Sequence, residues 1–314
     1  MKKYSIGVDL GGTKILSGVV DTTTGEVISS AKKRTKIENS QGCDVLVKRI
    51  IKTIEEALAE SNLSMDDIEQ IGMGVPGQVD RKNGILISAP NLNTSNLNFK
   101  QVLGDYFKKT VKISNDVDVA TIGEHNFGAA KGYSSAICIF VGTGIGAGII
   151  SGNQIWEGAT GTAGEIGHMI VSCGGRPCGC GGNGCLEAYA SRTAIEKQIL
   201  AKIKKGQVSN IEISKDDKIR SNSIKKAVKA GDELVIHALE EASEYLGCGI
   251  ASVVNFYNPE VIILGGGLVE ALDYFYDLTV QKTCEKALFV PSKEIKILKT
   301  QLGDFAGIIG AAIL

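Results

Sequence analysis

The sequence contains no long apolar run and almost no net charge, and both absences narrow the classes of protein to which it can belong. Among its 314 residues, no stretch approaches the ~20 consecutive apolar residues that a membrane-spanning helix needs. The formal net charge is −1, so no general attraction to nucleic acid or to an anionic membrane is expected. A signal peptide is not indicated, because Asp9 and the Gly11-Gly12 pair interrupt the first apolar segment. We therefore expect a cytoplasmic protein that binds neither nucleic acid nor membrane.

The common nucleotide-binding motifs are also missing. No Gly-Lys-Ser or Gly-Lys-Thr occurs, which excludes a P-loop. The letters of Gly72-x-Gly74-x-x-Gly77 match the dinucleotide fingerprint, which requires a helix directly after it. Pro76 and the polar, turn-rich residues after Gly77 argue against such a helix, so this match is rejected.

The hydrophobic pattern predicts an α/β protein in which one unit of strand, Gly/Thr turn and returning strand occurs twice, at 4–20 and 135–150. The chain is long enough for two domains, and this repeat predicts a duplicated fold with a cleft between its halves. The predicted small domain consists of residues 1–114 and a C-terminal helix at about 301–314, and the large domain of residues 115–300. Periodicity predicts further strands at 26–35, 68–75, 111–114 and 261–264, helices at 43–60, 116–127, 232–257 and 304–314, and solvated helices and loops at 202–232.

Three glycine-rich turns at the ends of predicted strands are candidates for holding phosphate. In the first, exposed N–H groups of Gly11 and Gly12 can form an anion nest, to which Thr13 adds a hydroxyl and Lys14 a positive charge. Asp9, at the end of the preceding strand, can hold Mg²⁺ through water. For this turn alone an ordinary hairpin is an equally good explanation. The other two turns are Gly142, Thr143 and Gly144 (continuing to Gly146), and Gly265, Gly266 and Gly267.

A short glycine-rich segment supplies one imidazole and three thiols, from His168, Cys178, Cys180 and Cys185. Zinc prefers four tetrahedral nitrogen and sulfur ligands, and a complete protein set indicates a structural site. A redox centre and a disulfide are the alternatives. The segment has no Cys-x-x-Cys pair, and a cytoplasmic protein rarely keeps a disulfide, so zinc is favoured. Cys173 would be a fifth ligand.

Asn115 and Asp116, at a predicted strand-to-helix junction, have the functional groups that phosphoryl transfer to a hydroxyl requires. An amide can orient a sugar hydroxyl and a carboxylate can accept its proton. Position alone leaves open whether Asp116 is only a helix N-cap, a role that Asp118 can also fill.

The order of the three turns resembles that of the sugar-kinase, actin and heat-shock-chaperone superfamily, and within it the chain resembles the ROK family across essentially its whole length. Gly164-Glu-Ile-Gly-His168 and the segment from Cys178 to Glu187 resemble the two ROK kinase signatures, and Cys173 falls outside both. The cysteine spacing resembles the glucokinase type more than the fructokinase type, in which a second histidine joins the ligands.

This resemblance implies an actin-like ATPase fold, ATP and Mg²⁺ at the first two turns, adenosine near the third, and a homodimer. It also implies that Asp116 is the general base and that the sugar is bound by Asn115, Glu165, His168 and Glu187, with Gly77 and Asn91 as further contacts. The implied reaction is phosphorylation of a hexose at its 6-hydroxyl, with glucose favoured. The alternatives are N-acetylmannosamine, N-acetylglucosamine, allose or fructose as substrate. Family repressors carry an N-terminal helix-turn-helix, which we do not expect here because the first turn begins near residue 9.

Overall fold

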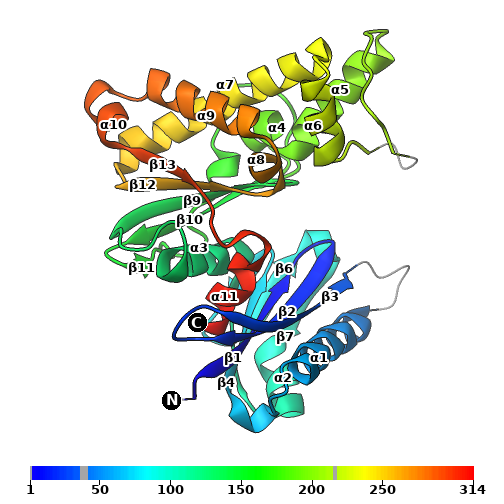
Figure 1. The fold of residues 1–314 in the computed structure, drawn as a ribbon, viewed down its shortest axis with the longest axis vertical. Helices are drawn as coiled ribbons and strands as arrows, with labels where there is room; N and C mark the ends of the chain where they lie inside the picture. Colours follow the sequence, from blue (N-terminus) through cyan, green and yellow to red (C-terminus); the bar gives the residue numbers. More distant parts are fainter. Residues whose placement is uncertain (1, 36–41, 215–217) are drawn as a thin grey trace. The chain divides into compact units, whose positions relative to one another are not determined.

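The computed structural model describes residues 2–35, 42–214 and 218–314, and the chain divides into two compact units (Figure 1). Unit 1 comprises Met1–Ser134, Gly148–Ala163 and Gln301–Leu314. Unit 2 comprises Ser135–Ala147 and Gly164–Thr300. Strands and helices alternate in both units, which confirms the predicted α/β class.

Unit 1 is built on a five-stranded sheet with the strand order β3-β2-β1-β4-β8. Strand β1 pairs antiparallel with β2 and parallel with β4, and β4 pairs in parallel with β8. All five strands were predicted, and in the structure they are β1 (Tyr4–Leu10), β2 (Lys14–Asp21), β3 (Val27–Arg34), β4 (Ile68–Val75) and β8 (Thr110–Asn115).

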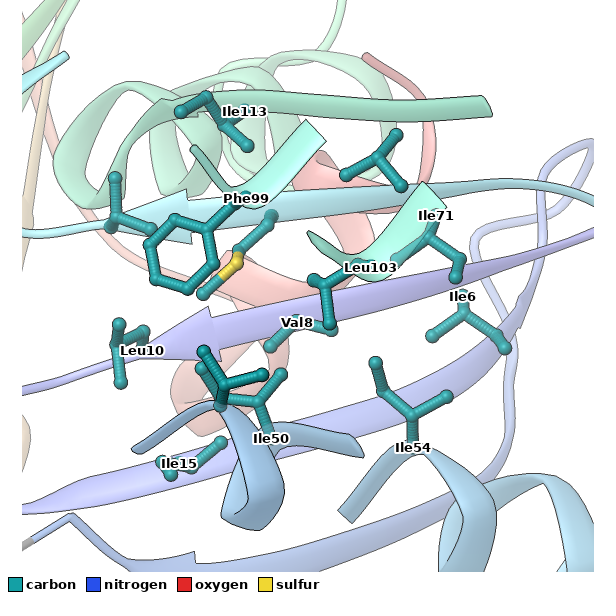
Figure 2. Close-up of a cluster of buried hydrophobic side chains, with 14 of the residues drawn as sticks. Ile6, Val8, Leu10, Ile15, Ile50, Ile54, Ile71, Phe99, Leu103 and Ile113 are labelled. Atoms are coloured by element: carbon teal, nitrogen blue, oxygen red, sulfur yellow. The ribbon is translucent and has the colours of Figure 1, made fainter. Parts of the chain in front are cut away.

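One face of this sheet packs on α1 (Gly42–Glu60), the helix predicted at 43–60. Successive residues of a strand point to opposite faces of the sheet, so Ile6, Val8 and Leu10 of β1 share one face. All three are fully buried. Ile50 and Ile54, one helical turn apart on α1, belong to the same buried cluster (Figure 2). The core of unit 1 lies here.

The opposite face of the sheet carries glycines, and α11 (Ala306–Ala312) lies directly on it. A Cβ atom at Gly7 would lie 1.8 Å from the carbonyl oxygen of Ile308, and one at Gly72 would lie 1.7 Å from that of Ala311. Helix α3 (Asp116–Phe127) approaches α11 equally closely, because a Cβ atom at Gly310 would lie 1.7 Å from the Val119 carbonyl oxygen. The predicted small-residue helix is therefore present, preceded by the 3₁₀ turn η4 (Gly303–Phe305).

The predicted domains were residues 1–114 with a C-terminal helix at about 301–314, and residues 115–300. The two compact units differ from this division within residues 115–163. Helix α3 and residues 148–163 lie in unit 1. One physical reason is Glu124 of α3, whose buried carboxylate accepts hydrogen bonds from the backbone N–H groups of Gln301 and Leu302, at 3.0 and 2.9 Å. These bonds attach α3 to the segment that leads into α11.

A small antiparallel sheet of unit 1 has the order β5-β6-β7 and was not predicted. Its strands are too short for a clear alternation of apolar and polar residues. They are β5 (Gln78–Asp80), β6 (Ile85–Ala89) and β7 (Thr94–Asn98), and they lead into α2 (Phe99–Phe107); the 3₁₀ turns η1 (Met65–Asp67) and η2 (Pro90–Leu92) lie nearby in sequence.

The second five-stranded sheet has the order β11-β10-β9-β12-β13, which repeats the order of the first. Strand β12 pairs in parallel with β9 and β13, as β4 does with β1 and β8, and β10 pairs antiparallel with β11. The predicted duplication is thus confirmed. The strands are β9 (Ser135–Val141), β10 (Ile145–Ser151), within which the division between the units falls, β11 (Gln154–Ile155), β12 (Val261–Gly265) and β13 (Lys296–Lys299).

The remainder of unit 2 is largely helical. Helix α7 (Glu233–Tyr257) is the one predicted at 232–257, and the Asp232 side chain caps it by accepting a hydrogen bond from Val235 N. Residues 215–217 of the predicted solvated segment lie outside the described residues. No helix in the described ranges is long and apolar enough to cross a membrane. The other elements are η3 (Ile166–His168), α4 (Glu187–Ala190), α5 (Arg192–Lys204), α6 (Ser221–Lys229), α8 (Gly267–Ala271), α9 (Asp273–Lys286) and α10 (Phe289–Glu294).

We expect Gly72→Ala to destabilise unit 1, because the new methyl group would occupy the position of the Ala311 carbonyl oxygen. Overpacking of this kind costs roughly 1–3 kcal/mol or more. Gly104→Ala in α2 is the matched control, since its Cβ atom would make only ordinary contacts, the nearest at 3.5 Å. Urea unfolding of both variants provides the measurement. Equal midpoints for the two variants would contradict the contact between α11 and the sheet.

Candidate functional site

The first glycine-rich turn joins β1 to β2 and is closed by a hydrogen bond from Gly11 N to Lys14 O, at 2.8 Å. The hydroxyl of Thr35, the residue after β3, donates to Gly11 O at 2.7 Å and so holds the turn. Gly12 and Thr13 are exposed, and a Cβ atom at Gly12 would approach only the Asn91 side chain, at 3.9 Å. The structure thus brings Asn91 beside this turn and leaves space above Gly12 that a phosphate can approach.

Asp9 lies at the end of β1, with its carboxylate against α11: a Cβ atom at Gly307 would lie 2.9 Å from Asp9 Cγ. Burial, reinforced by the nearby charges of Asp116 and Asp304, raises the pKa of Asp9 to about 6, although Lys14 opposes the shift. Lys14 Nζ pairs with Asp304 at 2.8 Å, and this pairing lowers the pKa of Asp304. Asp304 was not predicted as a site residue, since no motif distinguishes it from other exposed acidic residues.

Asn115 caps α3: its Oδ1 accepts hydrogen bonds from Val117 N at 2.9 Å and from Asp118 N at 3.4 Å. Neither Asp116 nor Asp118 is therefore the N-cap, the role that position alone had left open for them. Asn115 Nδ2 donates to Gly77 O at 3.3 Å, so these two predicted sugar contacts bind each other. Asp116 occupies the first helical position, and its Oδ1 accepts a hydrogen bond from Val117 N at 3.0 Å.

The two glycine-rich turns of unit 2 follow β9 and β12, which are parallel neighbours, so the turns lie at the same edge of the sheet. Gly266 has a φ of +96°, and a Cβ atom there would lie 2.4 Å from Val141 O. Only glycine fits this backbone conformation at this distance. Thr143 is exposed, and a Cβ atom at Gly142 or Gly267 would meet nothing within 4 Å.

Glu187 links the turn after β9 to the cysteine-containing segment. Its Oε2 accepts a hydrogen bond from Ile145 N at 2.9 Å, and a Cβ atom at Gly144 would lie 2.3 Å from that oxygen. Its Oε1 lies 4.0 Å from Cys178 Sγ. This carboxylate, predicted to bind sugar, thus already has one oxygen engaged with the turn.

The four predicted metal ligands, His168, Cys178, Cys180 and Cys185, lie together, with ligand atoms all within 4.8 Å of one another. Cys178 Sγ is 3.7 Å from His168 Nδ1, and Cys180 Sγ is 3.7 Å from Cys185 Sγ. Ligands around a tetrahedral zinc are separated by about 3.5–3.8 Å, given bond lengths of about 2.0 and 2.3 Å. The donor set and its spacing therefore fit zinc. Cys173 is exposed and does not belong to the cluster.

The thiols of this cluster differ in acidity. Burial, with hydrogen bonds to the neighbouring thiols, raises the pKa of Cys185 to about 12, so Cys185 is a neutral thiol at neutral pH unless a cation binds beside it. The backbone hydrogen bond from Gly182 lowers the pKa of Cys180. His168 directs Nδ1 to the cluster, and its Nε2 lies 3.9 Å from Glu165 Oε2. One ring nitrogen of His168 thus faces the cysteines and the other faces Glu165. Binding a metal and a sugar at the same time requires such an arrangement.

Comparisons with known proteins agree on one family. The model of the ROK family matches residues 5–314. A glucokinase of Halalkalibacterium halodurans is 31% identical over 315 residues, covering 99% of this chain and 94% of that protein. A xylose repressor of Caldicellulosiruptor bescii is 32% identical over 311 residues, covering 97% of this chain and 76% of the repressor. The crystal structure of a ROK family glucokinase from Streptomyces griseus in complex with glucose and AMPPNP is 31% identical, with a TM-score of 0.83 and 98% of both chains covered.

The raised pKa of Asp9 has a consequence for stability. Its folded-state pKa of about 6 exceeds the ordinary 3.8, so the native state binds this proton more tightly than the unfolded chain does. Stability must fall as the pH rises from about 4 to about 6, and the loss is fully present at pH 8. Asp9→Asn should therefore raise the free energy of unfolding at pH 8 by up to about 3 kcal/mol, and by little at pH 4.

Urea unfolding at both pH values, without magnesium, measures this difference. Asp105→Asn, on the exposed side of α2, is the matched control and should show no such gain. A gain from Asp9→Asn that is equal at pH 4 and pH 8 would contradict the electrostatic explanation.

Proposed function

The chain belongs to the ROK family, and on this premise we propose that it transfers the γ-phosphoryl group of ATP to the 6-hydroxyl of a hexose, most simply glucose. Similarity to glucokinases across 99% of the chain supports the reaction. The observation that carries the proposal is the position of Asp116, a carboxylate at the first turn of α3, close enough to Asp9 to raise its pKa.

Asp116 is the proposed general base. Because Asn115 is the cap of α3, the Asp116 carboxylate is not required for that role. It accepts the proton of the 6-hydroxyl as the sugar oxygen bonds to the γ-phosphorus and the bond from that phosphorus to the β–γ bridging oxygen breaks. ADP leaves with the bridging oxygen, and the Asp116 carboxyl group then releases its proton to solvent. Asp9 would hold Mg²⁺ through water, which would neutralise charge on the phosphates.

The proposed phosphate contacts come from the exposed turns. Gly12 and Thr13 supply N–H and hydroxyl donors, and Lys14 supplies charge once it exchanges Asp304 for a phosphate. Gly11 closes the turn with its N–H and lets the backbone approach the phosphate. In unit 2, Thr143 and Gly144 supply donors in the same way, and Gly142 closes that turn through its N–H bond to Gly144 O. Residues 265–267 are proposed to lie near the adenosine.

The proposed sugar contacts are Glu165, His168 and Glu187, which all lie next to the cysteine cluster. His168 donates from Nε2, while Glu187 uses Oε1, since Oε2 is bound to Ile145 N. Asn115 Nδ2 and Gly77 O are already hydrogen-bonded to each other. These two residues can therefore bind the sugar only with the donor and acceptor capacity that this bond leaves. Asn91 is the remaining proposed contact.

Sugar binding without phosphorylation is the second candidate function, because xylose repressors match the chain at similar identity. N-acetylmannosamine, N-acetylglucosamine, allose and fructose remain alternative substrates of a kinase. The homodimer also remains a proposal, which light scattering of the purified protein would test.

The decisive experiment measures ADP release by the purified protein with ATP, Mg²⁺ and a panel of these sugars. We expect glucose-dependent turnover, and Asp116→Ala should lower kcat by about 10²–10⁴-fold because the base is lost. Its melting temperature should stay within a few degrees of the wild type. Tight glucose binding with no turnover on any sugar would favour the repressor function, and near-normal turnover of Asp116→Ala would refute the base.

We also propose that His168, Cys178, Cys180 and Cys185 hold a structural zinc, whose role when bound is to fix the loop that presents Glu165 and Glu187. A structural zinc can contribute ~10–16 kcal/mol of apparent folding free energy. Elemental analysis should find one zinc per chain, and Cys180→Ser should lose the zinc and lower the melting temperature. Cys173→Ser, outside the cluster, is the matched control and should keep both. Zinc retained in Cys180→Ser would rule out this ligand set.

A further inference from the structure

Strand β5 is attached to the first turn of α3 on both sides of Asp116. Just before β5, Gly77 O accepts a hydrogen bond from Asn115 Nδ2 at 3.3 Å. Just after its end, Arg81 Nη2 pairs with Asp118 Oδ2 at 2.5 Å. Asn115 and Asp118 flank Asp116 in sequence, so these two contacts together hold the backbone that carries the proposed base.

The pair of Arg81 and Asp118 is well shielded from water, with side chains 18% and 9% exposed. A shielded ion pair is costly to break from one side, because the remaining carboxylate loses its cation in a poorly solvated place. The second arm of the guanidinium, Nη1, pairs with Glu157. A guanidinium can reach both carboxylates at once, which the single ammonium of lysine cannot do with the same geometry.

Arg81 is itself held in a tight turn between β5 and β6. Asp80 accepts hydrogen bonds from Asn83 N at 3.0 Å and from Asn83 Nδ2 at 2.7 Å. Gly84 N donates to Asp80 O at 2.8 Å, and Gly84 has a φ of +72° that favours glycine. Because this turn is fixed, the backbone from which the Arg81 side chain projects has a defined position.

We propose that Arg81 is a positioning residue for Asp116: by holding Asp118 it fixes the first turn of α3 and so the direction of the Asp116 carboxylate. This inference rests on the proposed function of Asp116. A base must lie within hydrogen-bond reach of the proton it accepts, so a small displacement of this turn slows proton transfer while ATP contacts elsewhere stay intact.

The test is a double-mutant cycle of Arg81→Gln and Asp116→Ala in the full-length protein. Arg81→Gln alone should lower kcat by about 10–100-fold, the cost of misplacing a reacting group by about an ångström, with little change in the KM for ATP. In the Asp116→Ala background the same substitution should change kcat less than about twofold, because the group it positions is absent. Losses that multiply in the double variant would overturn the proposal.

Two matched variants separate positioning from general damage. Lys82→Gln removes a positive charge from the exposed neighbouring position and should leave kcat unchanged. Glu157→Gln removes the partner of the other arm and should also have little effect, whereas a loss as large as that of Arg81→Gln would overturn the link through Asp118. If Arg81→Gln does not fold, Arg81→Lys replaces it in the cycle, with a smaller loss expected and the same rule for the double variant.

The cycle also separates this inference from the proposed function. If Asp116→Ala alone turns over normally, the assignment of the base fails, and the inference fails with it. If Asp116→Ala is severely impaired but the effect of Arg81→Gln is undiminished in its background, only the positioning role fails.

Discussion

Unit 1 depends on a direct approach of helix backbone to sheet backbone. Gly7 and Gly72 leave the sheet without side chains where α11 crosses it, so the carbonyl groups of Ile308 and Ala311 occupy the positions of missing methyl groups. The same approach brings Gly307 against the Asp9 carboxylate and buries it. The packing of α11 therefore completes the fold of unit 1 and also determines the electrostatics of Asp9, the candidate magnesium ligand.

In unit 2 a single carboxylate connects the parts of the candidate site. Glu187 begins α4, accepts a hydrogen bond from the turn after β9 through one oxygen, and lies near Cys178 through the other. A Cβ atom at Gly144 would lie 2.3 Å from that carboxylate, so the Glu187 side chain would have to shift to admit one. Glu187 therefore lies in contact with both the turn and the cysteine cluster.

The sequence predicted the elements whose pattern is repeated and strongly apolar, such as β1, β4, β9 and α7, and it predicted the four members of the cysteine cluster. It missed β5 to β7, which are too short to show a period. It also missed the cap of α3. Only Asp116 and Asp118 were considered for that role, and the backbone geometry selects Asn115, which is an equally good cap residue. The pairings of Lys14 with Asp304 and of Arg81 with Asp118 join residues far apart in sequence, and no local pattern reveals them.

The close fit of α11 on β1 also has a consequence for synthesis. The residues that cover the glycine-bearing face of β1 are made about 300 positions after β1 itself. The strands can pair and bury their apolar face on α1 meanwhile, but the other face must wait as an uncovered backbone surface. The nascent chain therefore holds an incomplete first unit until α11 has been made and has emerged to cover that face.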